Sequence, residues 1–204
     1  MIEMKECCVE GYPQALAADK RGADRVELCE NLAEGGTTPS YGAVKLSVER
    51  LQAKVAVMIR PRGGNFVYSQ EEFDCMREDM KTLKTLNPDV FVLGFLHEDN
   101  NLDREHIQEF VALADPIPVT FHMAFNRVPD QKEAIDFLAG IGVERILTSG
   151  KEGKAPDHLS HIKELIDYAA GRIIIMPGAG IRSDNLDEVH KFLQGTEYHG
   201  TKIV

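Results

Sequence analysis

The sequence predicts an α/β fold, a TIM-type (β/α)8 barrel that occupies residues 1–204 as a single domain. Eight short runs of apolar and β-branched residues recur along the chain. Their starts lie 21 to 36 residues apart, about one strand–helix unit each. No hairpin-type turn separates consecutive runs, so the strands are expected to be parallel, with right-handed crossovers. An open doubly wound sheet is the alternative, but eight units favour closure into a barrel.

The strands are predicted where the chain is most apolar, because the strands of a parallel sheet are covered by helices. They span residues 3–9, 24–30, 54–60, 90–96, 118–124, 144–150, 172–178 and 197–204.

Helix signals fill the intervals between these runs. Ser69 with Glu72 forms a capping box, and Asp130 with Glu133 repeats the same device. The remaining pairs of start and stop signals are Pro13 with Gly22, Asp157 with Gly171, and Ser183 with Gly195. The chain stops within or just after the eighth strand. The sequence therefore predicts a barrel whose final helix is missing or truncated.

Composition excludes several classes of protein. The net charge of −10 and the pI near 5.2 argue against binding to nucleic acid, because no basic cluster outweighs the acidic background. No run approaches the roughly 18 apolar residues needed to span a bilayer, and acidic residues come too early for a signal peptide. We expect a cytoplasmic protein whose four cysteines are thiols, since they are too few for a disulfide scaffold.

Two Glu-x-Cys patterns mark the first and second strands. Side chains two residues apart share a face of a strand, so Glu6 lies on the same side as Cys8, and Glu27 on the same side as Cys29. Neighbouring strands could combine these into a cluster of two thiols and two carboxylates. Adjacent thiolates select Cu(I) or zinc, whereas the alternative is that both cysteines are small packing residues. Packing is the expected role of the remaining cysteines, which are Cys7 and Cys75.

Charged side chains also stand toward the ends of predicted strands, namely Glu6, Glu27, Arg60 and His122. They could form ion pairs that hold the mouth together, with Arg60 bound to Glu27 or Glu6. They could instead form a catalytic constellation in which a carboxylate is the acid or base, His122 moves protons and Arg60 clamps an anion. Both interpretations stay open, and Arg60 is expected to be shared between a glutamate and a ligand.

The loops after the strands point toward anions. "PGAGIRSDN" (177–185) and "TSGKEGK" (148–154) place glycines directly after predicted strands, where free backbone N–H groups favour phosphate or carboxylate. Glycine and serine are also common in any such turn. In "MIRPRGGNF", Arg62 lies beyond Pro61 and is expected to meet solvent or a ligand. The candidate ligand-binding residues are Arg62, Ser149, Gly150, Gly178 and Gly180.

The motifs "ADRVELCENLAEGGTTPS", "MIRPRGGNF", "VTFHMAF", "ERILTSG" and "MPGAGI", in this order, resemble the CutC family of copper homeostasis proteins. The resemblance implies a cytoplasmic TIM-type barrel, usually a homo-oligomer, with Cys8 and Cys29 as the candidate Cu(I) ligands. It also implies that Glu6, Glu27, Arg60 and His122 form a charged barrel mouth. The family pattern FHRAFD reads FHMAFN here, so Met123 and Asn126 replace an arginine and an aspartate, and "HGTKIV" departs from the usual turn after the histidine.

Such a polar, ionisable mouth also suits an enzyme. The alternative function is therefore a barrel enzyme that acts on a small phosphorylated or carboxylate metabolite. Glu6 or Glu27 would act with His122 as acid and base, and Arg60 would clamp the anion. The expected binding partner is accordingly either a copper ion or a small anionic metabolite.

Overall fold

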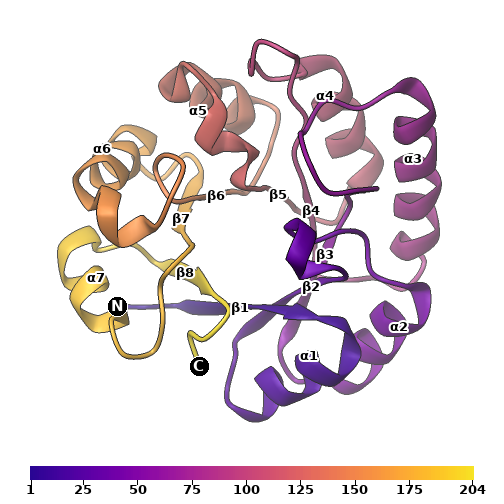
Figure 1. Cartoon of the computed structure of the whole chain (residues 1–204), viewed down its shortest axis with the longest axis horizontal. Coiled ribbons are helices and arrows are strands. Elements are labelled where there is room, and N and C mark those ends of the chain that lie inside the picture. The colour runs from indigo at the N-terminus through magenta and orange to yellow at the C-terminus, as the bar shows by residue number, and fades with distance from the viewer.

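Eight parallel strands form the centre of the computed structural model, which describes residues 1–204. They are β1 (Met4–Glu10), β2 (Arg25–Cys29), β3 (Lys54–Met58), β4 (Val90–Leu93), β5 (Val119–Phe121), β6 (Arg145–Thr148), β7 (Ile174–Pro177) and β8 (Glu197–Gly200). The hydrogen-bonded ladder runs in the order β7-β6-β5-β4-β3-β2-β1-β8. Its two end strands lie next to each other, and a parallel bridge between Arg182 and Lys202 joins the chain beyond them. The predicted barrel is confirmed (Figure 1).

Seven α-helices surround this ring. They are α1 (Gly11–Lys20), α2 (Tyr41–Arg50), α3 (Gln70–Lys84), α4 (Arg104–Ala114), α5 (Gln131–Gly140), α6 (Leu159–Ala169) and α7 (Leu186–Leu193). Three short 3-10 turns lie in the loops, namely η1 (Leu32–Glu34), η2 (Met123–Arg127) and η3 (Ala155–His158). No helix follows β8 within these residues, as the sequence predicted. None of the helices combines the length and the apolar character required to cross a membrane.

The helix signals read from the sequence are confirmed in part. The capping box of Ser69 and Glu72 is present at the start of α3, and the Asp130 side chain accepts from the backbone N–H of Glu133 at the start of α5. The helix start predicted at Ser183 was wrong, because α7 begins three residues later, at Leu186. Ser183 donates its backbone N–H to the carbonyl of Lys202 at 2.9 Å. This segment therefore pairs with the chain after β8 before the helix can start.

Alternation along the strands creates two separate cores. The larger core lies between the sheet and the helices and contains the outward-facing side chains, such as Cys7, Val55 and Val57. The smaller core lies inside the barrel and includes Cys29 and Met58. The two cysteines of "CC" therefore point to opposite sides of β1, as strand geometry requires. Only the inward-facing positions can contribute to a site at the mouth.

Candidate functional site

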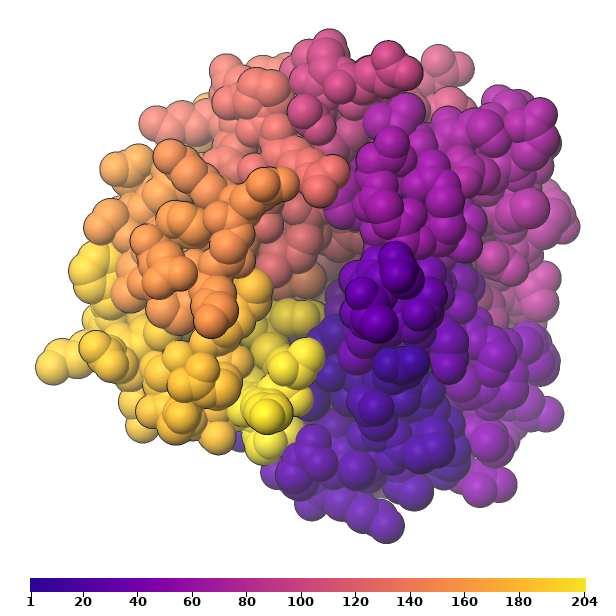
Figure 2. Space-filling view, viewed as in Figure 1, coloured from indigo at the N-terminus to yellow at the C-terminus, as the bar shows by residue number.

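A cavity of about 140 Å³ opens at the carboxyl ends of the strands, among the loops that follow them. In Figure 2 the surface is hollowed between the yellow C-terminal segment and the indigo segment near residue 30. Its lining residues are Cys8, Glu27, Gly35, Met58, Arg60, Phe66, His122, Met123, Leu147 and His199. This is the end of a TIM-type barrel where functional residues collect.

The register of β1 and β2 decides which of the predicted thiols and carboxylates meet. Cys8 stands opposite Glu27, while Cys29 stands opposite Glu10 and so lies nearer the mouth. The Cys8 sulfur, a Glu27 oxygen and a His199 ring nitrogen all lie within 4.8 Å of one another. The Cys29 thiol donates to Glu27 Oε2 at 3.8 Å, and Cys8 packs against the smaller core that contains Cys29. The structure therefore groups Cys8, Glu27 and His199, with the Cys29 thiol on the same glutamate, and a cluster of two thiols stays a prediction.

A network of buried charged side chains lies next to this cluster, deeper inside the barrel. Glu6 is bound to the Arg25 guanidinium, and Arg25 Nη2 also donates to Glu197 Oε2 at 2.6 Å. Arg145 Nε reaches the same Glu197 oxygen at 3.1 Å. Burial would raise the pKa of Glu6, but the charges of Arg25 and His199 outweigh it and lower this pKa to about 2. Glu6 is thus a permanent anion at the centre of the barrel.

His199 connects this network to the mouth. Its Nδ1 lies 2.8 Å from Glu6 Oε1, and its Nε2 lies 3.7 Å from Glu27 Oε2. Burial alone would disfavour the imidazolium, but Glu27, Cys8 and Glu6 outweigh burial and raise the pKa of His199 well above its ordinary value. The ring is therefore protonated at neutral pH, with its Nδ1–H directed at Glu6 and its Nε2 on the side of Glu27.

Both thiols at the mouth are held in the protonated form. The hydrogen bond with Cys29, burial and the Glu27 charge together raise the pKa of Cys8 well above its ordinary value. For Cys29, the bond from Cys8 lowers the pKa, but burial and Glu27 outweigh it and the net shift is upward. All four cysteines of the chain are free thiols. Cys75 lies exposed on α3 and Cys7 lies in the outer core, so neither thiol belongs to the inside of the barrel.

Arg60 does not pair with either glutamate, so the predicted ion pair with Glu6 or Glu27 was wrong. Its Nη1 donates to the carbonyls of Glu34 at 3.0 Å and Gly36 at 2.9 Å, and its Nη2 donates to Gly64 at 3.0 Å. The register places Arg25, rather than Arg60, opposite Glu6. Arg60 lies beyond the end of β3 and ties two loops together, which leaves its charge without an acidic partner.

His122 lies at the end of β5, against the backbone of β4. A Cβ at Gly94 would come within 2.5 Å of the imidazole, so a glycine is required there. Burial and the neighbouring charge of Arg60 lower the pKa of His122 to about 3, and the ring is neutral. Its Nδ1 accepts the backbone N–H of Ala124 at 3.2 Å. The proton of the neutral ring is therefore on Nε2, which has no hydrogen-bond partner.

Three of the predicted ligand-binding residues form hydrogen bonds within their own loops or with a neighbouring helix. Arg62 forms an ion pair with Glu72 and donates to loop carbonyls. Ser149 Oγ donates to the Lys151 carbonyl at 2.6 Å, and the Gly150 N–H donates to Thr148 Oγ1 at 2.9 Å. These groups already have partners within the loops.

The glycines after β7 lie close to the cavity. A Cβ at Gly178 would come within 2.6 Å of Leu147 Cδ1 and 3.1 Å of His199 Cδ2, and both of those side chains line the cavity. Gly180 has a positive φ of 79° and packs against the Lys154 side chain. Gly178 therefore lets two lining residues approach the chain, while anion binding at these glycines stays a prediction.

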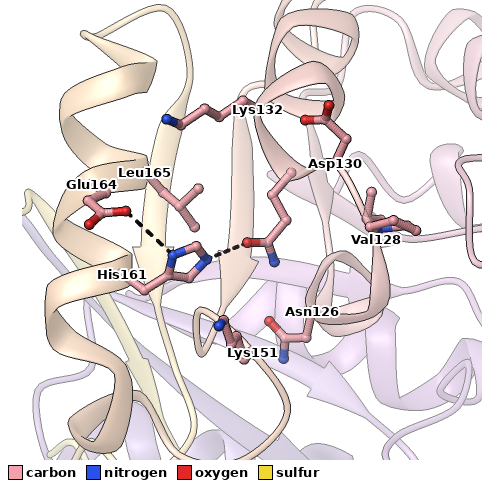
Figure 3. A pocket seen from close by; sticks show the side chains of 10 residues that line it. Asn126, Val128, Asp130, Lys132, Lys151, His161, Glu164 and Leu165 are labelled. Carbon is pink, nitrogen blue, oxygen red and sulfur yellow. Dashed lines mark hydrogen bonds and ion pairs between the residues drawn. The ribbon is translucent and has the colours of Figure 1, made fainter.

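A larger groove of about 510 Å³ lies outside the mouth, between α5 and α6 (Figure 3). The His161 ring stands at its centre, with Nε2 2.6 Å from Gln131 Oε1 and Nδ1 3.8 Å from Glu164. Asn126 at its edge is bonded to Thr148 and Ser149. Its central polar side chains are thus satisfied by one another, which is typical of a structural contact between helices.

The sequence reasoning missed His199, although a usable signal was present. His199 is two residues from Glu197 in the last apolar run, so both share a face of β8. Closure of the barrel places β8 beside β1, where Glu6 stands opposite His199. An expectation of closure, applied to the charged residues of the last strand, would have brought this histidine into the site.

Comparison with known proteins agrees with this architecture. The CutC family model matches residues 3–204. The chain is 45% identical to the copper homeostasis protein cutC homolog of Mus musculus, over 96% of this chain and 72% of the relative. It is also 45% identical to the CutC family protein of Enterococcus faecalis, over 98% of this chain and all of that one.

A solved structure gives the same result for the whole molecule. The crystal structure of a candidate copper homeostasis protein CutC from Streptococcus agalactiae superimposes with a TM-score of 0.94 and 41% identity, and the two chains cover each other fully. The matched length and identity leave one conclusion: this chain belongs to the CutC family.

Proposed function

We propose that this CutC family protein acts in copper homeostasis by binding Cu(I) between the thiols of Cys8 and Cys29. The observation that supports the proposal is that Glu27 lies beside the sulfurs of both cysteines, with Cys8 lining an open cavity and packing against the smaller core that contains Cys29. Two thiolates suffice for a linear Cu(I) site, and soft sulfur ligands select Cu(I) or zinc over hard ions. Copper is the cargo in this proposal.

The surroundings of the two thiols favour a monovalent ion. Glu27 lies beside both sulfurs, and His199 lies within 4.8 Å of the Cys8 sulfur. Two thiolates with one Cu(I) carry a net charge of −1, which the protonated His199 ring balances locally. The two protons that the thiols lose on binding can leave through the cavity that Cys8 lines.

The experiment is a competition titration of the reduced protein with Cu(I) against a chromophoric Cu(I) chelator. Cys8→Ser and Cys29→Ser should each lower the affinity at least a hundredfold, because each removes one of two soft ligands. Cys75→Ser is the matched control, since this cysteine is exposed on α3, and it should leave the affinity unchanged. A double Cys8→Ser and Cys29→Ser variant that is folded by circular dichroism and still binds Cu(I) as tightly as the parent would refute the proposal.

The cytoplasmic location and the homo-oligomeric state expected from the sequence stay predictions alongside this proposal. Cell fractionation with an antibody against the chain tests the location. Light scattering of the purified protein over a range of concentrations tests the oligomeric state, and a monomer at all concentrations would contradict it.

A further inference from the structure

Three buried polar atoms without partners belong to residues that line one cavity. Across the molecule five buried side-chain nitrogen or oxygen atoms lack a hydrogen bond, and three of them belong to residues of the mouth cavity. They are Glu27 Oε1, Arg60 Nε and His122 Nε2. Their residues are 3%, 4% and 4% exposed, so bulk solvent does not satisfy these atoms. An unsatisfied buried polar atom costs about 1–3 kcal/mol, so three around one space indicate a place built for a ligand.

The donor and acceptor character of each atom follows from its contacts. Arg60 Nε and His122 Nε2 each present an N–H, the first on a cation and the second on a neutral ring. Glu27 Oε1 presents an acceptor, while the other oxygen of Glu27 faces Cys29 and His199. The residues around the cavity thus hold two donors and one acceptor that have no partner within the protein.

The charge of Arg60 defines the ligand further. Its guanidinium is bonded to three backbone carbonyls and to no carboxylate, so a buried cation lacks a counter-ion. The Phe66 ring lies 5.1 Å below this guanidinium and 5.0 Å from the His122 ring, so it packs against both donors. An anion placed against the two donors would compensate the charge in a site of low dielectric.

We propose that the mouth cavity binds a small 2-hydroxy carboxylate, with its carboxylate on Arg60 Nε and His122 Nε2 and its hydroxyl on Glu27 Oε1. A carboxylate has two oxygens for two donors. A phosphate would bring further charged oxygens into a cavity that Met58, Met123 and Leu147 also line, and would add charge beside Glu27. The volume of about 140 Å³ is well below the roughly 300 Å³ at which pockets for drug-sized ligands begin. The ligand therefore has only a few carbon atoms.

This binding site does not depend on copper. Cys8 forms part of the cavity wall, but none of the three unpartnered atoms belongs to a proposed copper ligand. The experiment uses copper-free, reduced protein, so a failure to bind Cu(I) in the titration above leaves the carboxylate proposal standing. Likewise, a failure to bind the carboxylate leaves the Cu(I) proposal standing.

The test follows the side-chain N–H signals of His122 and Arg60 by NMR in ¹⁵N-labelled wild-type protein at pH 7. Racemic sodium lactate, sodium propionate and sodium phosphate are titrated at constant ionic strength. Lactate is expected to shift both signals saturably. Propionate, which lacks the hydroxyl, is expected to bind about tenfold more weakly, the equivalent of one lost hydrogen bond. Phosphate is expected to cause no saturable shift.

Variants separate the site from a general charge effect. His122→Asn removes the Nε2 donor but keeps an acceptor for the Ala124 N–H, and it should weaken lactate about tenfold. Arg172→Gln removes an exposed arginine at the opposite end of the barrel and should change nothing. Arg60 also ties loops, so its role is followed through its own NMR signal in the wild-type protein. The proposal is overturned if lactate causes no saturable shift, if propionate or phosphate binds as tightly as lactate, or if His122→Asn binds lactate normally.

Discussion

The neutral, buried state of His122 predicts a specific loss of stability in acid. In an unfolded chain histidine titrates near 6.5, whereas burial and Arg60 lower the pKa of His122 to about 3 in the folded protein. Between these values the unfolded state takes up a proton that the folded state does not. This difference lowers the free energy of unfolding by about 1.4 kcal/mol for each pH unit below 6.5, or about 2 kcal/mol at pH 5.

Urea unfolding measured at half-unit steps from pH 7 to pH 5 tests this, with His122→Asn as the comparison. Every other titratable group is present in both proteins, so its contribution cancels when the two stability curves are subtracted. The Asn side chain keeps an acceptor for the Ala124 N–H. The variant should therefore lose less stability than the wild type on acidification, by about 2 kcal/mol at pH 5. Parallel curves, or an NMR titration of the His122 ring centred near 6.5, would refute the reasoning.

Two further predictions concern the parts that support the mouth. Gly178→Ala should lower the free energy of unfolding by about 1–3 kcal/mol in urea, because its Cβ would lie 2.6 Å from Leu147 and 3.1 Å from His199. Gly42→Ala on α2 is the matched control. Nothing lies within 4 Å of that Cβ, so this variant should stabilise the protein by up to about 1 kcal/mol. An equal loss of stability in both variants would contradict the steric argument. Arg25→Met should cost about 3–5 kcal/mol, because it leaves the buried Glu6 and Glu197 carboxylates without this cation, and an unchanged urea midpoint would show that the network contributes nothing.

The strands and several helix ends could be predicted because they depend on neighbours in the sequence. The capping box at Ser69 needs only residues three apart, and the opposite orientation of Cys7 and Cys8 needs only the alternation of a strand. The start of α7 was misplaced because Ser183 pairs with Lys202, which is distant in the sequence. Local signals cannot detect such a competitor.

Which residues meet at the site depends on the stagger of the strands and on the paths of the loops, and local sequence patterns determine neither. Pairing of Cys8 with Glu27 follows from the stagger between β1 and β2, which side-chain alternation does not determine. Arg60 was expected to meet a glutamate because both are charged and near strand ends. It binds instead to the carbonyls of Glu34, Gly36 and Gly64, and the path of those loops becomes visible only in three dimensions.

The order of the strands has a mechanical consequence for the mouth. The hydrogen-bonded ladder ends at β7 and β8, so the ring has one junction without continuous strand pairing. Side-chain packing and the Arg182–Lys202 bridge beyond the strands hold this junction together. Small changes in circumference cost least at that junction, because no ladder has to break. His199 stands on its β8 side, fixed to Glu6 of the paired strand β1, and Gly178 stands on its β7 side. Opening of the ring there would separate Leu147 from His199 and enlarge the cavity, while Cys8, Glu27 and His199 kept their spacing as one rigid wall.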